Sequence, residues 1–403
     1  MRLAVATPFL DRRHGTERAL AELLERLVRD YRCTVYLYAQ RVTDCSPALL
    51  GPLSGDAPRV VWRRVPSLPG PHLLRFAAWF VLNTLLRKWD ALVRGLRFDL
   101  VFSPGINCPD AQVVLVHAVF HRLAALQHSQ PLLRALPLSA WPAILHRGLY
   151  YRFIRFLERR IYANPAVTLA AVSRRTARQL EEFFTRREVP VVWNGVDTAV
   201  FHPAARHSRR LSARQRWNFR EDETVFLLIG NDWKNKGLPT LLQAAALCSD
   251  LPLRLLIVGE EDPARFAAAL ASCNLQQRVS FSSPVADVVD LYAAADAYAG
   301  PSLEDSFNLP ALEAMACGLP IILSTSAGLS DALHDGVDAL LLQNAQDPAE
   351  LAALLRKLLQ NPALRERLGT QAAATAHGLS WEEHARRIHA LLETRLAASR
   401  TLS

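Results

Sequence analysis

The feature of this chain that most constrains its fold is a regular alternation of short apolar runs with segments of helical periodicity, which occurs in two series. In the first series, the runs that predict buried strands are Leu3–Phe9, Thr34–Tyr38, Leu100–Ser103, Val113–His117 and Val167–Val172. In the second series, they are Thr224–Ile229, Leu253–Val258, Val279–Phe281, Ala297–Ala299, Pro320–Leu323 and Ala339–Leu342. Strands that alternate with helices are typical of doubly wound parallel sheets, so the sequence predicts an α/β fold.

The length of the chain and the spacing of the two series predict two domains. At roughly 100–200 residues per domain, a chain of 403 residues favours two. The polar, arginine-rich segment 203–220 lies between the two series and places the boundary near residue 205. We therefore expect a first domain over residues 1–205, a second domain over residues 206–380 and a C-terminal helix over residues 381–403.

The composition excludes several classes of protein. Apolar residues make up 50% of the chain and charged residues 21%, which excludes intrinsic disorder. The six cysteines include no C-x-x-C pair, so neither a disulfide framework nor a zinc site is predicted, and a reducing compartment is expected. The apolar stretch Phe76–Leu86 is about half of the ~20 residues that a spanning helix needs. We interpret Met1–Leu10 as a first strand rather than a signal peptide.

Charge is distributed unevenly between the two halves. Residues 1–200 hold 28 Lys+Arg and 15 Asp+Glu, a net charge of +13, whereas residues 201–403 hold 19 and 23, a net charge of −4. The stretches Leu73–Arg97 and Pro131–Tyr162 also mix large apolar residues with arginine at helical spacing. These stretches suit an anionic membrane surface. The alternative is that both are ordinary helices packed on a sheet, with solvated arginine faces.

The segment Pro301–Pro320, PSLEDSFNLPALEAMACGLP, carries the strongest chemical signal. It leaves a predicted strand, passes through a polar loop and enters a helix with Pro310 near its first turn. Backbone N–H groups at the start of a helix bind anions. Asp305 and Glu313, eight residues apart, would add two acceptors for hydroxyl groups. Hydrogen-bond donors for phosphate beside two carboxylates suit a sugar nucleotide. The alternative is a pair of solvated carboxylates beside a helix start.

This segment resembles the signature of the retaining glycosyltransferases of family four, E-G-F-G-L-x-x-x-E-A-M-A-x-G-x-P. The matching positions are Phe307, Leu309, Glu313, Ala314, Met315, Ala316, Gly318 and Pro320. The chain departs from the signature at Asp305, where Glu is usual, and at Asn308, where Gly is usual. The resemblance implies the GT-B fold, which has two Rossmann-like domains facing across a cleft and a C-terminal helix that crosses back to the first domain.

Other landmarks follow in the order of the same family. Asn194–Asp197 with Phe201 resembles its interdomain turn. The loop Asn231–Gly237 resembles the one whose basic residues hold the donor diphosphate, which implies that role for Lys236. Since the arginine usual before the Lys-Gly pair is missing, Lys234 is the candidate for the second charge.

The first domain carries two weaker matches. Gly15 opens a helix after the first strand, as in the family's glycine loop near the acceptor and the transferred sugar, although an ordinary turn would look the same. His117 resembles the cleft histidine of the family. A core histidine is the alternative interpretation for His117, and it is the favoured interpretation for His121.

The resemblance also implies the donor chemistry. Lys236 and the backbone amides of Ser306, Phe307, Asn308 and Leu309 would hold a nucleoside diphosphate, with a UDP-sugar favoured. Glu313 would accept from the ribose hydroxyls and Asp305 from hydroxyls of the transferred hexose. Because no D-x-D motif is present, we expect neither a metal ion nor another cofactor. Transfer would retain the anomeric configuration and would need no protein nucleophile.

The acceptor is less constrained. The segment Val5–Leu20 and the loop Asn231–Gly237 look most like those of lipopolysaccharide-core glucosyltransferases. This likeness implies a glycan or glycolipid acceptor of the cell envelope and a cytoplasmic protein, peripheral on the inner face of the membrane, with no nucleic-acid partner. Two alternatives remain open: an inactive sugar-nucleotide-binding protein, and a GT-B epimerase or phosphorylase. A phosphorylase needs a pyridoxal lysine, and Lys357 is the only late lysine.

Overall fold

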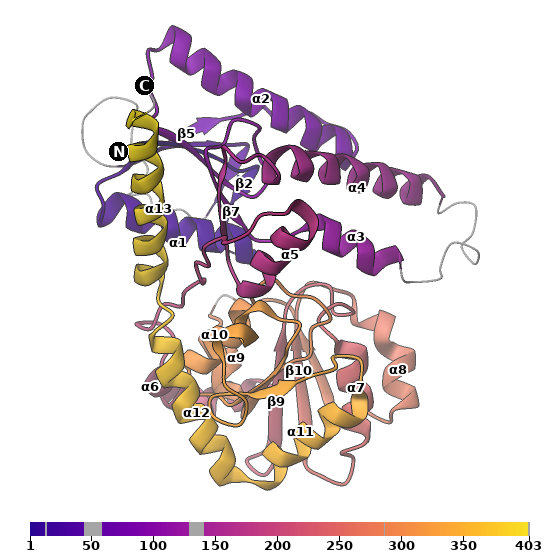
Figure 1. Cartoon of the computed structure of the whole chain (residues 1–403). Helices are drawn as coiled ribbons and strands as arrows, with labels where there is room; N and C mark the ends of the chain where they lie inside the picture. Colours follow the sequence, from indigo (N-terminus) through magenta and orange to yellow (C-terminus); the bar gives the residue numbers. More distant parts are fainter. Residues whose placement is uncertain (13, 44–58, 129–140, 286, 402–403) are drawn as a thin grey trace. The chain divides into compact units, whose positions relative to one another are not determined.

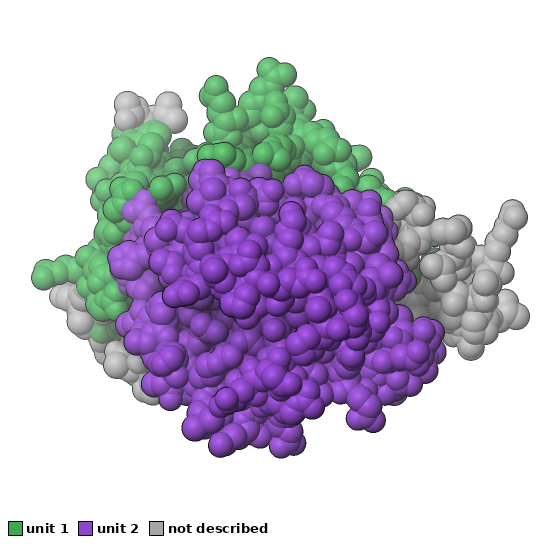
Figure 2. All heavy atoms as spheres, turned by 90° about the horizontal axis from the view of Figure 1, so that it is seen from below, with its two compact units in different colours: residues 1–192, 384–403 green, residues 193–383 purple. Residues whose placement is uncertain are grey.

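The computed structural model describes the chain except residues 13, 44–58, 129–140, 286 and 402–403 (Figure 1). The chain divides into two compact units: residues 1–192 with 384–403, and residues 193–383 (Figure 2). The division lies at Val192–Trp193, ahead of the boundary that the sequence places near residue 205. The reason is that α6 (Pro203–Arg216) packs on α9 (Val289–Ala294) of the second unit, where Arg206 donates to the carbonyl of Tyr292 at 3.2 Å.

The first unit is built on a six-stranded parallel sheet in the order β5-β3-β1-β6-β7-β8. Its strands are β1 (Arg2–Ala6), β3 (Thr34–Ala39), β5 (Val60–Arg64), β6 (Leu100–Pro104), β7 (Val113–Val116) and β8 (Thr168–Ala171). The chain moves from β1 outward to β5 and then returns to β6 on the other side of β1. This reversal is the doubly wound topology that the alternation of runs predicts.

Helices cover both faces of this sheet. One face packs on α1 (Gly15–Arg29) and on α13 (Trp381–Thr401), whose Ala385, Ile388 and Leu392 are buried in the same core. The other face packs on α2 (His72–Val93) and α4 (Trp141–Tyr162) through Trp79 and Ile154. The unit also contains α3 (Phe120–His128), α5 (Arg174–Phe184) and a short parallel pair, β2 (Phe9–Leu10) with β4 (Arg41–Val42).

Strand β5 is absent from the sequence-based prediction. It pairs with β3 at the edge of the sheet, and only Val60 and Val61 of its five residues are buried. An edge strand needs no continuous apolar run because part of it faces solvent. The segment VVWRR therefore lacks the pattern by which the other strands are recognised.

The second unit repeats the architecture, with a six-stranded parallel sheet in the order β11-β10-β9-β12-β13-β14. Its strands are β9 (Thr224–Ile229), β10 (Leu253–Val258), β11 (Val279–Ser282), β12 (Ala297–Gly300), β13 (Ile321–Ser324) and β14 (Leu340–Leu342). Its further helices are α7 (Leu238–Ala246), α8 (Ala267–Ser272), α10 (Leu309–Ala316), α11 (Pro348–Gln360) and α12 (Pro362–His377). The predicted α/β fold class is confirmed in both units.

Helix α2 is held on its sheet by a buried polar network. Asp90, fully buried, accepts hydrogen bonds from Arg63 Nε at 2.8 Å, Arg63 Nη2 at 2.6 Å and the Tyr38 hydroxyl at 2.9 Å. Burial, and then the hydrogen bond to Asp90, raises the pKa of Tyr38. One turn away, Arg87 donates to Asn83 and Asp110. None of the described helices is long and apolar enough to cross a membrane.

We predict that Asp90→Ala destabilises the first unit by about 3 kcal/mol or more, because it leaves the Arg63 guanidinium largely buried without its partner. Urea unfolding measures the effect. The control is Asp222→Ala, which removes an exposed partner of Arg220 and should leave the unfolding midpoint unchanged. Equal midpoints for the two variants would contradict the role of Asp90.

Candidate active site

The candidate site lies where the sheet of the second unit reverses its winding. Strands β9 and β12 are neighbours, but the chain visits β10 and β11 on one side before it reaches β12 on the other. The loops that leave the carboxyl ends of such a strand pair diverge, and open α/β sheets bind ligands there. The loops in question are residues 230–237 after β9 and residues 301–308 after β12, which are the two loops that the sequence selected.

An ion pair joins these loops. Lys236 Nζ lies 2.6 Å from Asp305 Oδ2, and the two side chains are 20% and 12% exposed. The backbones are joined as well, since Asn235 Nδ2 donates to the carbonyl of Glu304 at 2.9 Å and Leu303 N donates to the carbonyl of Asn235 at 2.8 Å. The structure thus brings two residues that the sequence assigned to the donor site into direct contact.

Two glycines allow the first loop to take this path. Gly237, the N-cap residue that precedes helix α7, has φ +81°, and a Cβ atom there would lie 1.9 Å from the carbonyl oxygen of Pro301. Gly230 has φ +148°, and a Cβ atom there would lie 2.7 Å from Cε of Lys236. A side chain at Gly230 would therefore displace the lysine from its position beside Asp305.

Asn308 shows how the chain accommodates one departure from the family signature. Its φ is +79°, in the left-handed region, where glycine is usual and asparagine is better tolerated than most residues. Its Oδ1 atom accepts from Ala311 N at 3.1 Å, which caps helix α10, and from the Tyr298 hydroxyl at 3.1 Å. Asparagine thus supplies both the backbone conformation and the helix cap.

The remaining donor-site residues lie on either side of Asn308. Glu313, on α10, is 4% exposed and accepts from the Tyr292 hydroxyl at 2.6 Å. Burial, and then the charge of Glu313, raises the pKa of Tyr292. Among the loop amides, Phe307 N donates to Asp305 Oδ1 at 3.2 Å, which was not anticipated. Lys234 and Ser306 lie on the same two loops, and Leu309 is the first residue of α10.

Gly15 and His117 belong to the first unit. Gly15 is the exposed first residue of α1. His117 directly follows β7, is 8% exposed, and neither of its ring nitrogens has a hydrogen-bond partner in the described part of the chain. Desolvation, and then the nearby His384, lowers the pKa of His117 to about 3, so the imidazole is neutral near pH 7.

His121 is a core residue with a partner that the sequence reasoning missed. Its Nδ1 atom lies 2.6 Å from Oε2 of Glu158, which is fully buried. Glu158 also accepts from Phe120 N at 2.6 Å and His121 N at 3.0 Å, so it caps helix α3. Burial raises the pKa of Glu158 to about 8. A sequence signal existed, because Glu158 is the one acid in the helical stretch that forms α4.

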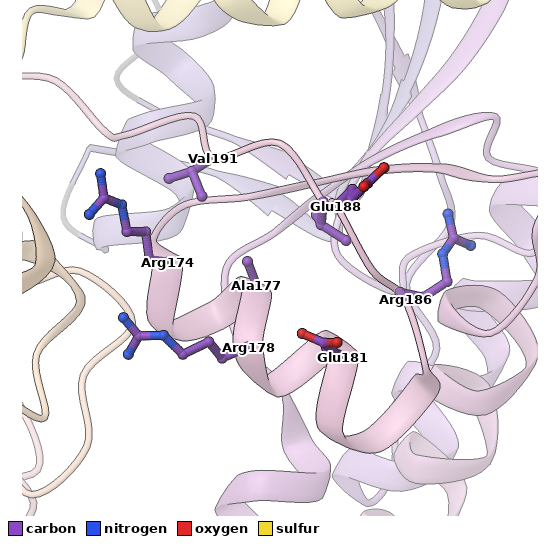
Figure 3. Close-up of a pocket in the computed structure, with 8 residues that line it drawn as sticks. Arg174, Ala177, Arg178, Glu181, Arg186, Glu188 and Val191 are labelled. Atoms are coloured by element: carbon purple, nitrogen blue, oxygen red, sulfur yellow. The ribbon is translucent and has the colours of Figure 1, made fainter.

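A separate hollow of about 300 Å³ lies in the first unit beside α5 (Figure 3). It is lined by Arg174, Ala177, Arg178, Glu181, Arg186, Glu188, Val189 and Val191. Arg186 is already engaged, since it donates to the carbonyls of Tyr162, Asn164 and Val167. None of the predicted site residues lines this hollow. Across the described residues, no group of three or more His, Cys, Asp and Glu could hold a metal ion.

Two family models account for most of the chain. Residues 13–200 match the model described as Glycosyltransferase Family 4, and residues 210–375 match the model described as Glycosyl transferases group 1. The first match covers most of the first unit and includes Gly15 and His117. The second match lies within the second unit and includes Lys236, Asp305 and Glu313. The chain therefore has the two-domain fold of the group 1/family 4 glycosyltransferases, with one family model matching each half.

Similar solved structures define the fold. WaaG, a glycosyltransferase involved in lipopolysaccharide biosynthesis, aligns with a TM-score of 0.75 at 18% identity, over 97% of this chain and 99% of that chain. Anabaena Alr3699/HepE in complex with UDP and glucose aligns with a TM-score of 0.70 at 17% identity, over 98% and 99%. The predicted GT-B fold is confirmed.

Curated relatives share more sequence over shorter segments. A D-inositol 3-phosphate glycosyltransferase of Streptosporangium roseum is 33% identical over 214 residues, which is 50% of this chain and 48% of the relative. One of Nocardia farcinica is 32% identical over 301 residues, which is 71% and 62%. The chain spans about half the length of the first of these relatives. These relatives are named for a different acceptor from the lipopolysaccharide core that the sequence likeness implied.

We predict that Gly237→Ala destabilises the second unit more than Gly336→Ala does. Both glycines have φ near +75–80°, which costs an L-residue about 1–2 kcal/mol, but a Cβ at Gly336 meets nothing within 4 Å. The difference between the two variants therefore measures the contact with Pro301. Urea unfolding measures both losses, and equal losses would mean that the two loops separate without cost.

We predict that the first unit loses stability as the pH falls from about 6.5 toward 4. A folded-state pKa of about 3 for His117 lies below its unfolded value, so the stabilisation is present above the unfolded pKa and is lost as the pH falls toward the folded pKa. The loss at pH 4 is about 3 kcal/mol. Urea unfolding at pH 7 and pH 4 should show a smaller difference for His117→Asn than for the unmodified chain. The control, His377→Asn at an exposed site, should leave the difference unchanged.

Proposed function

We propose that this protein is a retaining, metal-independent glycosyltransferase that moves a hexose from a nucleoside-diphosphate sugar, with a UDP-sugar favoured. The observation that carries the proposal is the Lys236–Asp305 pair at the winding reversal of the second unit, with Glu313 on the adjoining helix. Solved neighbours support the donor class, since Anabaena HepE is described in complex with UDP-glucose.

In this proposal each donor-site residue has one task. Lys236 stabilises the charge that grows on the leaving diphosphate, which is the largest electrostatic demand of the reaction. Asp305 accepts from hydroxyls of the transferred hexose, and Glu313 accepts from the ribose hydroxyls. Lys234 and the amides from Ser306 to Leu309 supply further donors to the phosphates, helped by the N-terminal end of α10.

The reaction needs no protein nucleophile. The acceptor hydroxyl attacks the anomeric carbon on the face from which the diphosphate departs. The bond from that carbon to the phosphate oxygen breaks, and the departing oxygen takes the proton of the acceptor. Lys236 then neutralises the released diphosphate. His117 is proposed to contact the transferred sugar, because a neutral imidazole can accept a hydrogen bond from a sugar hydroxyl. Gly15 would let the backbone approach the same sugar.

The proposed acceptor is a glycan or glycolipid of the cell envelope, used at the cytoplasmic face of an anionic membrane. The net charge of +13 over residues 1–200 and the description of WaaG support it. A second candidate is a phosphorylated polyol, which the name of the D-inositol 3-phosphate glycosyltransferases favours. A phosphorylase is disfavoured because Lys357 is exposed in the last turn of α11, where it could not hold a buried pyridoxal group.

A nucleotide-sugar screen by thermal shift tests the proposal. Binding stabilises a protein by about 2.7 kcal/mol when the ligand exceeds its Kd a hundredfold. A UDP-sugar should raise the unfolding temperature and should be hydrolysed slowly in the presence of EDTA. Binding without hydrolysis would favour the inactive binding protein, and activity that requires Mg²⁺ or Mn²⁺ would contradict the metal-independent assignment.

We predict that Asp305→Ala lowers kcat/KM on the order of 10²-fold, or ~2.7 kcal/mol, whereas Glu304→Ala costs less than tenfold. Lys236→Ala should lower kcat far more than it weakens UDP binding, because its charge matters most as the diphosphate leaves. The double variant Lys236→Ala/Asp305→Ala should lose less than the sum of the single losses, since the two side chains are in contact. The reverse ranking of Asp305 and Glu304 would show that the sequence register is wrong.

A further inference from the structure

Helix α2 differs from an ordinary surface helix because large apolar residues lie on its outer side as well as on its inner side, where Phe76, Phe80, Leu82 and Leu86 pack partly buried on the core. Its buried residues are Trp79, Asn83, Arg87 and Asp90, three of which are polar or charged. Its exposed residues include Leu74, Val81, Leu85, Trp89 and Leu92, which are 53–84% exposed. These five recur at intervals of seven, four, four and three residues, which places them on one side of the helix.

The inward-facing polar network fixes this orientation. A rotation of α2 that buried its outward-facing leucines against the sheet would break the hydrogen bonds that Asp90 accepts from Arg63 and Tyr38. It would also remove Asn83 Nδ2 from the carbonyl of Asn107, which lies at 3.3 Å. The apolar side of α2 is therefore held outward by interactions on the opposite side of the helix.

Helix α4 extends this surface. It lies beside α2 (Figure 1), where the ring of Phe76 is 6.3 Å from that of Tyr150 and 6.4 Å from that of Phe153. Both helices cover the same side of the sheet and contribute to one core. The outer side of α4 carries exposed apolar residues and arginines in alternation: Leu145, Leu149, Arg152, Phe156, Arg159 and Arg160. We call the outward sides of these two helices the α2–α4 face.

The α2–α4 face is strongly positive. Each helix contains one acidic residue, Asp90 in α2 and Glu158 in α4, and both are fully buried. The exposed charged residues of α2 and of the described part of α4 are therefore all basic: Arg75, Lys88, Arg147, Arg152, Arg159 and Arg160. Apolar and aromatic side chains interleaved with arginine and lysine are the pattern of a helix that lies in a membrane interface.

We propose that the α2–α4 face docks the first unit on a bilayer that contains anionic phospholipids, with both helices parallel to the surface. The 22-residue α2 would lie along about 33 Å of the interface. Its leucines and Trp89 enter the boundary between headgroups and acyl chains, while the arginines of α4 contact lipid phosphates. The inference deepens the membrane-associated acceptor of the proposed function and rests on it for its biological purpose.

A second copy of the chain is a poorer occupant than a bilayer. A symmetric dimer places the same patch of each copy against the other. It would bring the arginines of both copies together with no exposed acidic partner on either helix, and facing like charges oppose association. An anionic bilayer supplies the missing negative charge.

Vesicle co-sedimentation of the full chain tests the proposal. The probes are vesicles of phosphatidylcholine alone and of phosphatidylcholine with about 30% phosphatidylglycerol, which gives the second kind a negative surface potential. We expect binding to the anionic vesicles that weakens at high salt. Leu85→Glu/Leu92→Glu should weaken it at least tenfold. The matched control, Leu211→Glu/Leu247→Glu, changes two leucines of the second unit that are also more than half exposed, and it should bind as the unmodified chain.

Each alternative outcome overturns the proposal. Equal binding to neutral and anionic vesicles, or equal losses in the test and control variants, would remove the α2–α4 face from membrane binding. A lipid-free dimer that Leu85→Glu/Leu92→Glu dissociates, without vesicle binding, would assign the face to a second copy. Thermal shift with UDP-sugars on the same variants separates this question from the proposed function, because none of the residues proposed to contact the donor lies on the α2–α4 face.

Discussion

The ion pair between Lys236 and Asp305 joins two loops whose residues are 69 positions apart in the chain. Everything proposed for the donor site depends on this contact, because it places a cation beside the start of α10. The contact exists because β9 and β12 are adjacent in the sheet and their loops leave the same edge. Gly230 and Gly237 then let the first loop approach closely enough for the lysine to reach the carboxylate.

The pair also gives each of two partly buried charges a partner. Asp305 lies 2.6 Å from Lys236, so neither the cation nor the carboxylate is left alone. In the proposed function, a diphosphate takes the place of Asp305 beside Lys236, and Asp305 accepts instead from hydroxyls of the sugar.

The first unit uses buried charge differently. Asp90 with Arg63 ties α2 to the sheet, and Glu158 ties α4 to the first amides of α3. Buried ion pairs add little net stability over apolar packing, but they are costly to break and so favour one orientation. Here that orientation leaves leucine, tryptophan and arginine outward on α2 and α4. The same interactions that define the helix positions thereby create the α2–α4 face.

The sequence by itself determined the elements with strong local patterns. The runs Thr224–Ile229 and Leu253–Val258 are strands with the predicted bounds. The loops that carry Lys236 and Asp305, and the helix that carries Glu313, lie where the motifs place them. Buried parallel strands and helix starts are encoded by neighbouring residues, so local reasoning finds them.

Tertiary structure alone decided the contacts between distant residues. Edge strand β5, the Glu158–His121 pair and the inward-facing polar residues of α2 depend on partners elsewhere in the chain. The periodicity of α2 locates two sides of a helix but does not say which is buried. Asp90 faces inward because Arg63 and Tyr38 donate hydrogen bonds to it there. A periodic pattern contains no information about such partners.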